Sequence, residues 1–329
     1  MNTAEWFERW LEAYVKPSCK PAGYAQYKDI CFKHIIPALG VLPLEDMSTG
    51  VLQDFLNQQA AYGNLKTGGP LSAKSIKNMR VVLDVAFQKA VLEGHIRENP
   101  IPGTVIRKVP RPHIEAMEES HQQILETQLF KNQNYMDCPI LVSLYTGSRL
   151  GEICGLQWSD LNFALQEIWF CRTIKRLPTD QANSETCTLL TCSSTKGRDG
   201  YRIVPMPPVV MQLLRYQKQK AEQQFGPTQP DGFVFFNRQG HLIDPDNLSH
   251  YFTKLVRQLG LPHTRFHDLR HTFATRAIES GVDVLTLSGI LGHTDVSTTE
   301  HFYLHPRMES MHRAMSGIRP AASMDAFTL

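Results

Sequence analysis

Apolar residues recur at three- and four-residue spacing along the first hundred residues, which is the pattern of amphipathic helices. Four such stripes follow one another, within residues 6–14, 24–35, 51–56 and 76–90. Prolines, glycines and capping side chains set the expected limits of these helices: Pro17 after the first, the PALG stretch at 37–40 after the second, Ser48 or Thr49 before the third, Ser72 or Ser75 before the fourth and Gly94 after it. The pattern predicts a four-helix domain whose aromatic residues form its core.

The rest of the chain mixes helical and strand-like stretches. A helix begins near Glu118 and another ends at Gly147. Residues 166–174 are strand-like, and 186–207 form two β-rich arms around a glycine-containing turn, which predicts a hairpin. The apolar stretch 232–237 is either a lone strand or a buried segment. Helical patterns return at 247–260, capped by Asp244 or Asp246, and at 267–281, 283–292 and 296–305. The fold class is therefore mainly α with a small antiparallel β-sheet.

The length of 329 residues allows two domains. No apolar run is long enough to span a membrane, and the amino terminus mixes acidic with aromatic residues, unlike a signal peptide. The seven cysteines show no CxxC pair and no metal-ligand spacing, which favours free thiols, no metal and a cytoplasmic location.

Basic residues are unevenly distributed. The net charge is only +2, yet residues 1–113 contain 14 Lys and Arg against 10 Asp and Glu, a balance of +4, which leaves 20 against 22 for the remainder. Within the proline-containing linker 104–117 lie three basic residues, Arg107, Lys108 and Arg111. Such a cluster is either a solvated surface or a basic strap that follows DNA between two domains.

Four separate stretches of the second domain carry groups suited to phosphodiester chemistry. TGSRLGE contains Arg149 and Glu152, the expected hairpin turn contains Lys196, HDLRH contains His267 and Arg270, and LGHTDVSTTEHFYLHP contains His293 and Tyr303. Two guanidiniums can stabilise the charge that develops on a phosphate under attack, and a lysine can protonate the departing oxygen. Each residue alone has an ordinary structural explanation: a surface ion pair, a solvated turn lysine, a helix face or a core aromatic.

Taken together, the order and wording of TGSRLGEICGLQWSD, STKGRDGYRIVPM, HDLRHTFAT and LGHTDVSTTEHFY resemble the tyrosine recombinases, also called the phage integrase family. The resemblance covers the whole second domain, and the first resembles the helical, SAM-like core-binding domain of that family. It implies a core-binding domain at 1–103, the linker at 104–117, a catalytic α+β domain at 118–305 and a tail at 306–329.

The resemblance also implies a role for each residue. Arg149 and Arg270 bind the scissile phosphate, supported by Glu152 and by a hydrogen bond from His293. Lys196 protonates the leaving 5′ oxygen, and His267 acts as acid or base. Tyr303 is the nucleophile and forms a 3′-phosphotyrosine link with DNA. The residues expected to contact DNA outside this site are Arg107, Lys108, Arg111, Lys74, Lys77 and Arg80.

Two departures from the family pattern stand out. In many members the nucleophile lies nine residues after the Gly-His histidine, where this chain has Phe302; in others it lies ten after, as Tyr303 does. His271 competes with His267, but the H-x-x-R spacing favours His267. Many integrases also begin with an arm-binding domain, and this sequence begins with the core-binding helices. It either recognises only core sites or lacks that domain.

The implied activity is site-specific recombination through a Holliday junction by four protomers on double-stranded DNA, with no cofactor and with accessory factors that set direction. Two alternatives are a type IB topoisomerase that relaxes supercoils as a monomer and a non-catalytic DNA-binding regulator. The tail carries Met308, Met311 and Met315 at helical spacing. This apolar stripe either folds back on its own domain or docks on a neighbouring protomer.

Overall fold

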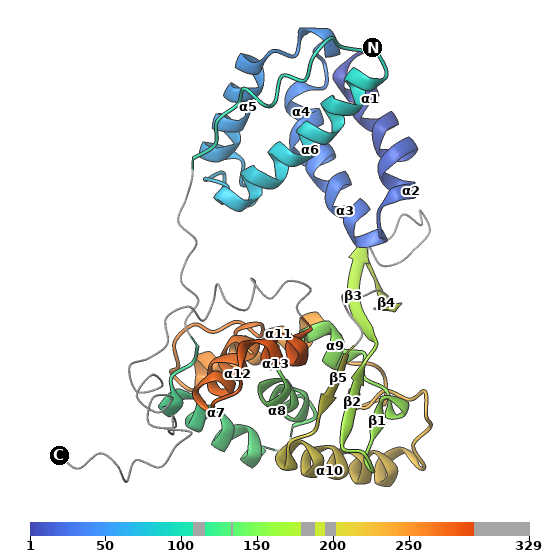
Figure 1. Ribbon diagram of the computed structural model, residues 1–329, viewed down its shortest axis with the longest axis vertical. Coiled ribbons are helices and arrows are strands. Elements are labelled where there is room, and N and C mark those ends of the chain that lie inside the picture. Colours follow the sequence, from blue (N-terminus) through green and yellow to red (C-terminus); the bar gives the residue numbers. More distant parts are fainter. Residues whose placement is uncertain (108–115, 133, 179–187, 195–201, 293–329) are drawn as a thin grey trace, which may run out of the picture. The chain divides into compact units, whose positions relative to one another are not determined.

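The computed structural model describes residues 1–107, 116–132, 134–178, 188–194 and 202–292. The chain divides into two compact units between residues 112 and 113, within the predicted linker (Figure 1). The exact domain boundaries remain a prediction. Among the described residues, no helix combines the length and apolar character needed to cross a membrane.

The first unit contains the four predicted helical rods. The first two rods are interrupted by single π-helical turns at Leu11–Val15 and Cys31–Ile35. The helices are α1 (Thr3–Trp10), α2 (Lys16–Ser18), α3 (Pro21–Ile30), α4 (Ile36–Leu39), α5 (Thr49–Tyr62) and α6 (Ala73–Leu92). Ser48 and Ser72 cap α5 and α6, as the sequence predicts.

The first two rods are both longer than predicted, because the first continues through Pro17 to Ser18 and the second through Pro37 to Leu39. Both π-helical turns directly precede a helix that contains a proline near its start, Pro17 in α2 and Pro37 in α4. A proline ring clashes with the preceding turn of a regular α-helix, and a wider turn relieves that clash. The aromatic core is as expected: Trp6, Phe7 and Phe87 are fully buried.

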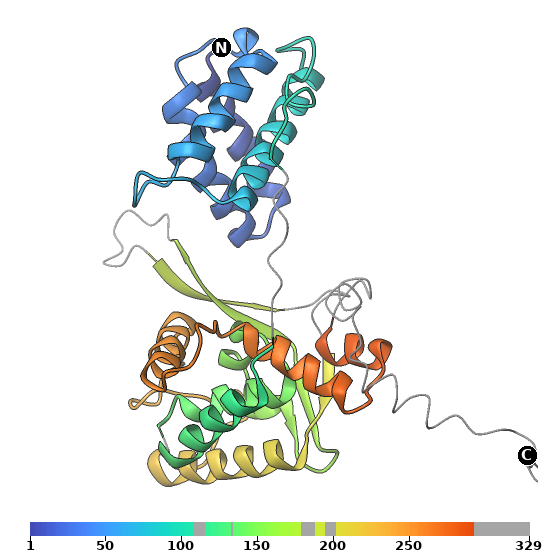
Figure 2. The same ribbon diagram turned by 90° about the vertical axis from the view of Figure 1, so that its left-hand side faces the viewer.

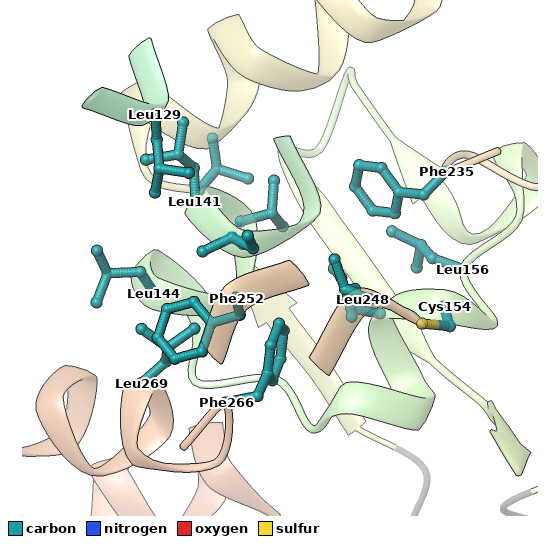
Figure 3. Close-up of a cluster of buried hydrophobic side chains, with 14 of the residues drawn as sticks. Leu129, Leu141, Leu144, Cys154, Leu156, Phe235, Leu248, Phe252, Phe266 and Leu269 are labelled. Atoms are coloured by element: carbon teal, nitrogen blue, oxygen red, sulfur yellow. The ribbon is translucent and has the colours of Figure 1, made fainter. Parts of the chain in front are cut away.

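The second unit is built around helix α8, which packs against α7, α10 and α12 (Figures 1 and 2). Buried leucine and phenylalanine side chains from α7, α8, α11 and α12 form its core, with Phe252 and Phe266 edge to face at 5.7 Å (Figure 3). The helices are α7 (Glu119–Asn132), α8 (Asp137–Thr146), α9 (Leu150–Cys154), α10 (Pro208–Phe225), α11 (Pro245–Gln258), α12 (Asp268–Glu279) and α13 (Val284–Leu291).

The strands of this unit pair differently from the prediction. They are β1 (Leu161–Asn162), β2 (Glu167–Phe170), β3 (Arg172–Pro178), β4 (Thr188–Ser194) and β5 (Arg202–Pro205). The two arms predicted as a hairpin, β4 and β5, are both strands, but in the described residues they belong to different sheets. β5 pairs antiparallel with β2, Phe170 opposite Arg202, and β4 pairs with β3.

The hairpin prediction was therefore wrong about the partners, for an identifiable reason. The break between β2 and β3 at Cys171 divides one long run into two strands, and each arm pairs with one of them. The segment 232–237 is a buried segment with two isolated bridges at Phe233 and Phe236. Asp244 caps α11, one of the two predicted caps.

Candidate active site

The turn between α8 and α9 positions Arg149. α8 ends at Thr146, and Gly147 follows in a left-handed conformation with φ of 63°. A Cβ on Gly147 would lie 2.6 Å from the ring of Phe273 and 2.7 Å from the side chain of Leu291. The turn therefore needs glycine both for its backbone angle and for close packing. Arg149 comes two residues later, as the N-cap of α9.

Glu152 is the centre of a buried ion cluster and is only 3% exposed. Its Oε1 accepts hydrogen bonds from Nη1 of Arg149 (2.7 Å) and Nη1 of Arg202 (2.8 Å). Its Oε2 accepts from the backbone N–H of Arg149 and from Nη2 of Arg202, both at 2.8 Å. Burial raises the pKa of this carboxyl, but the two guanidiniums outweigh burial and lower the pKa to about 2. Glu152 is therefore ionised at neutral pH.

Arg270, on α12, is almost completely buried. Its Nη1 donates to the carbonyl oxygen of Gly147 (2.9 Å) and its Nη2 to that of Leu291 (2.7 Å). These carbonyls lie at the carboxyl ends of α8 and α13, where carbonyls lack partners within the helix and the helix dipole is negative. The guanidinium of Arg270 is therefore held in one orientation between two helix ends.

The carboxyl end of α13 orients both arginines. Nη2 of Arg149 lies 3.4 Å from the carbonyl oxygen of Gly292, and the carbonyl of the preceding residue, Leu291, accepts from Arg270. Gly292 caps α13 in the left-handed conformation, with φ of 65°. Two successive carbonyls thus contact two guanidiniums. The result is a preorganised pair of cations, which suits a phosphate under nucleophilic attack.

His267 and His271 lie at the first turn of α12, with ring centroids 5.1 Å apart. His267 remains accessible to solvent, but protein atoms around the ring partly desolvate it, which lowers its pKa. The nearby His271, Arg270 and Arg149 lower this pKa further. Burial and the neighbouring arginines also lower the pKa of His271. Both imidazoles are therefore neutral at pH 7 and able to accept a proton. The geometry brings both candidates to the site and does not choose between them.

The structure brings together four of the seven predicted catalytic residues: Arg149, Glu152, His267 and Arg270. The other three, Lys196, His293 and Tyr303, lie outside the described residues. Their roles remain predictions from the sequence. In the chain, His293 directly follows Gly292, whose carbonyl contacts Arg149.

Arg202, which binds Glu152 with both terminal nitrogens, was not predicted from the sequence. A signal for it exists in the RIVP stretch: the buried positions of β5 alternate, so Arg202 faces inward with Val204. An arginine at an inward position requires a buried anion. The two carbonyls at the end of α13 were not predictable either, since backbone hydrogen-bond partners are not marked by any particular residue type.

The residues predicted to contact DNA differ in their surroundings. Lys74 and Lys77 are exposed on α6, and Arg107 is exposed just before the undescribed part of the linker. Arg80 is partly buried and donates to the hydroxyl of Thr104 (3.0 Å) and the carbonyl of Ile101 (3.3 Å). This arginine anchors the start of the linker. Lys108 and Arg111 lie outside the described residues.

No group of three or more His, Cys, Asp or Glu that could hold a metal ion is present in the part of the chain that the structure describes. That the protein needs neither a metal nor another cofactor stays a prediction from the sequence.

Comparison with known proteins places this chain in one class. The model of the phage integrase family matches residues 116–310, and that of the phage integrase N-terminal SAM-like domain matches residues 4–59. A tyrosine recombinase XerC-like protein of Caldanaerobacter subterraneus is 30% identical over 309 residues, which cover 90% of this chain and 77% of that protein. The transposase from transposon Tn916 of Enterococcus faecalis is 25% identical over a region that covers 72% of this chain and 60% of that protein.

Solved structures share the fold. The Tn1549 transposon integrase in complex with a circular intermediate DNA superposes with a TM-score of 0.78 at 22% identity, covering 96% of this chain and 99% of that one. The lambda integrase tetramer bound to a Holliday junction gives a TM-score of 0.64 at 19% identity. The match covers 90% of this chain and 79% of that one.

The two-unit fold is that of a tyrosine-type recombinase. The chain belongs to the phage integrase family. It is a site-specific DNA recombinase, as the resemblance in its sequence predicts.

Proposed function

We propose that this recombinase integrates and excises a mobile element by exchanging strands between two specific double-stranded DNA sites. The observation that carries the proposal is the pair of guanidiniums, Arg149 and Arg270, held by successive carbonyls of α13. The relatives named as a transposase and a transposon integrase support the mobile-element assignment. The place of action would be the cytoplasm, on nucleoid DNA, with accessory factors setting the direction.

In the proposed reaction, Arg149 and Arg270 bind the non-bridging oxygens of the scissile phosphate. The hydroxyl of Tyr303 attacks the phosphorus, and His267, neutral at pH 7, accepts the hydroxyl proton. The bond to the 5′ oxygen breaks, and Lys196 gives that oxygen a proton while His293 donates a hydrogen bond to the phosphate. The 3′-phosphotyrosine retains the energy of the broken bond, so rejoining by another 5′ hydroxyl needs no ATP.

Recombination requires cutting and rejoining four strands, two on each of two duplexes. Each protomer supplies one tyrosine, so the active assembly would contain four protomers of this chain. The lambda integrase tetramer on a Holliday junction, which shares this fold, supports that assembly.

The function is tested by incubating the purified chain with two plasmids that each carry a copy of its recombination site, in buffer with excess chelator. We expect joined recombinant products, because the proposed chemistry uses no metal, and a tetrameric complex in analytical ultracentrifugation. Relaxation of supercoils without recombinants would instead indicate a topoisomerase. Binding without any strand cleavage would indicate a regulator, and an absolute requirement for Mg²⁺ would contradict the mechanism.

The linker strap, defined as Arg107, Lys108 and Arg111, is proposed to bind DNA phosphates. Replacing all three by glutamine should flatten the dependence of log K on log salt by about 0.9 for each phosphate that is no longer neutralised, since fewer counterions are released on binding. Fluorescence anisotropy with a labelled core site at several salt concentrations measures the slope.

A matched control neutralises three basic residues on α7 and α10, Lys131, Arg215 and Lys218, which lie on helices that carry no predicted site residue. Their replacement by glutamine should leave the salt slope unchanged. If the strap variant also keeps the original slope, the strap does not bind DNA.

A further inference from the structure

We propose that Arg202 is a positioning residue that keeps the guanidinium of Arg149 available to the phosphate by holding Glu152 from the buried side. The inference rests on the proposed function, since it assumes that Arg149 binds the scissile phosphate. Arg202 itself is 6% exposed, so it acts through Glu152 rather than by touching DNA.

The carboxylate of Glu152 is shared between two arginines. A carboxylate has about four acceptor positions, and here Arg202 occupies two of them with both terminal nitrogens at 2.8 Å. Arg149 occupies the other two, one with its backbone N–H and one with Nη1. The side chain of Arg149 therefore gives the carboxylate a single N–H. Without Arg202, two acceptor positions of the buried carboxylate would lack a donor. The guanidinium of Arg149 would then be drawn into two hydrogen bonds with the carboxylate.

Arg202 also changes the net charge of the cluster. Arg149 and Glu152 alone would form a neutral pair, which attracts a phosphate weakly. Arg202 adds a second positive charge to the same carboxylate, so the three residues together carry a charge of +1. The guanidinium of Arg149 is the part of this cluster that reaches solvent: its side chain is 37% exposed, against 3% for Glu152 and 4% for Arg202. The net positive charge is thus presented where a phosphate can approach.

Packing also positions Arg202, although its buried Nε has no hydrogen-bond partner among the described residues. Its guanidinium carbon lies 4.5 Å from the centroid of the Phe170 ring, its partner across the strand pair. A Cβ on Gly292 would lie 2.9 Å from Cδ of Arg202, so the aliphatic stem packs directly on the residue whose carbonyl contacts Arg149. Arg202 therefore supports Arg149 through two routes, the Glu152 carboxylate and the end of α13.

The test measures single-turnover cleavage of a nicked suicide duplex, together with the dissociation constant for the same DNA. Arg202→Met should slow formation of the covalent complex by about ten- to a hundredfold, less than removal of a residue that binds the phosphate directly, with DNA affinity within about threefold. Arg202→Lys keeps the charge but not the two-bonded fork. Its cleavage rate should lie between those of Arg202→Met and the unmodified protein.

The coupling to Glu152 distinguishes positioning from a merely structural role. A neutral amide in place of the carboxylate no longer pulls on Arg149, so in a Glu152→Gln background the change Arg202→Met should cause at most a further twofold loss. Independent structural damage would instead multiply the two losses. Should Arg202→Met fail to fold, the same comparison is made with Arg202→Lys.

Arg172→Met is the matched control, because Arg172 also pairs with a buried carboxylate, Asp160, in the same unit. It should lower thermal stability while changing the cleavage rate by less than about threefold. Unchanged cleavage in both Arg202 variants, or losses that multiply with Glu152→Gln, would overturn the proposal. If the unmodified protein itself forms no covalent complex, the proposed function fails instead.

Discussion

Replacement of Tyr303 by phenylalanine should abolish the covalent protein–DNA complex and leave DNA binding intact. The change removes only the hydroxyl oxygen proposed to attack phosphorus, whereas the arginines proposed to bind the phosphate lie at the start of α9 and on α12. Denaturing gel electrophoresis of reactions with a nicked suicide duplex detects the covalent complex, and a gel-shift assay measures binding. We expect no covalent product at any enzyme concentration.

The neighbouring aromatic residue provides the control. Phe302 occupies the position of the nucleophile in many members of the family, but its ring has no hydroxyl. Phe302→Leu should therefore still form covalent complex. Covalent DNA on the Tyr303→Phe protein would show that another residue is the nucleophile.

The second large effect is expected for Arg270→Ala. This change removes one of the two preorganised cations, which should slow cleavage by about a hundredfold or more. It also leaves the carbonyls of Gly147 and Leu291 without their donor, and a buried polar group without a partner costs about 1–3 kcal/mol. We therefore expect a lower melting temperature together with the loss of cleavage. Single-turnover cleavage and thermal unfolding measure the two effects separately.

Arg276→Met, in the same helix as Arg270, separates the effect on cleavage from the effect on stability. Arg276 donates to the carbonyl of Met117 (2.7 Å) and to Gln122 (3.1 Å), away from the arginine pair. Its loss should reduce stability to a similar extent while cleavage falls by less than about tenfold. Equal losses of cleavage in the two variants would mean that Arg270 acts only through stability.

The helices of both units were predictable because their signals are local. Apolar spacing and caps such as Ser48, Ser72 and Asp244 operate within one or two turns of chain. The extension of the second rod through Pro37 was not, since the π-helical turn that accommodates it has no distinctive composition. The strand pairing was also missed. Whether β4 pairs with β5 or with β3 depends on contacts between residues far apart in the chain.

Four residues of the candidate site were likewise predictable from the sequence. Arg149, Glu152, His267 and Arg270 were identified by their order and spacing, and the fold brings them together. The hydrogen bonds and ion pairs among these residues could not be predicted from the sequence. Glu152 was predicted to support one arginine, and in the structure its carboxylate is shared by two, Arg149 and Arg202.

The amino-acid sequence by itself determined the helical class of the first unit and the family, and it predicted the candidate reactive groups, because each depends on residue identity at short range. Only the tertiary structure decided how the charges are balanced. Arg202 reaches Glu152 across 50 positions of chain, and Arg149 reaches the carbonyl of Gly292 across 143. The strength and direction of an electrostatic interaction depend on distance and burial, and both are set by the packing of β5 and α13 rather than by any local pattern.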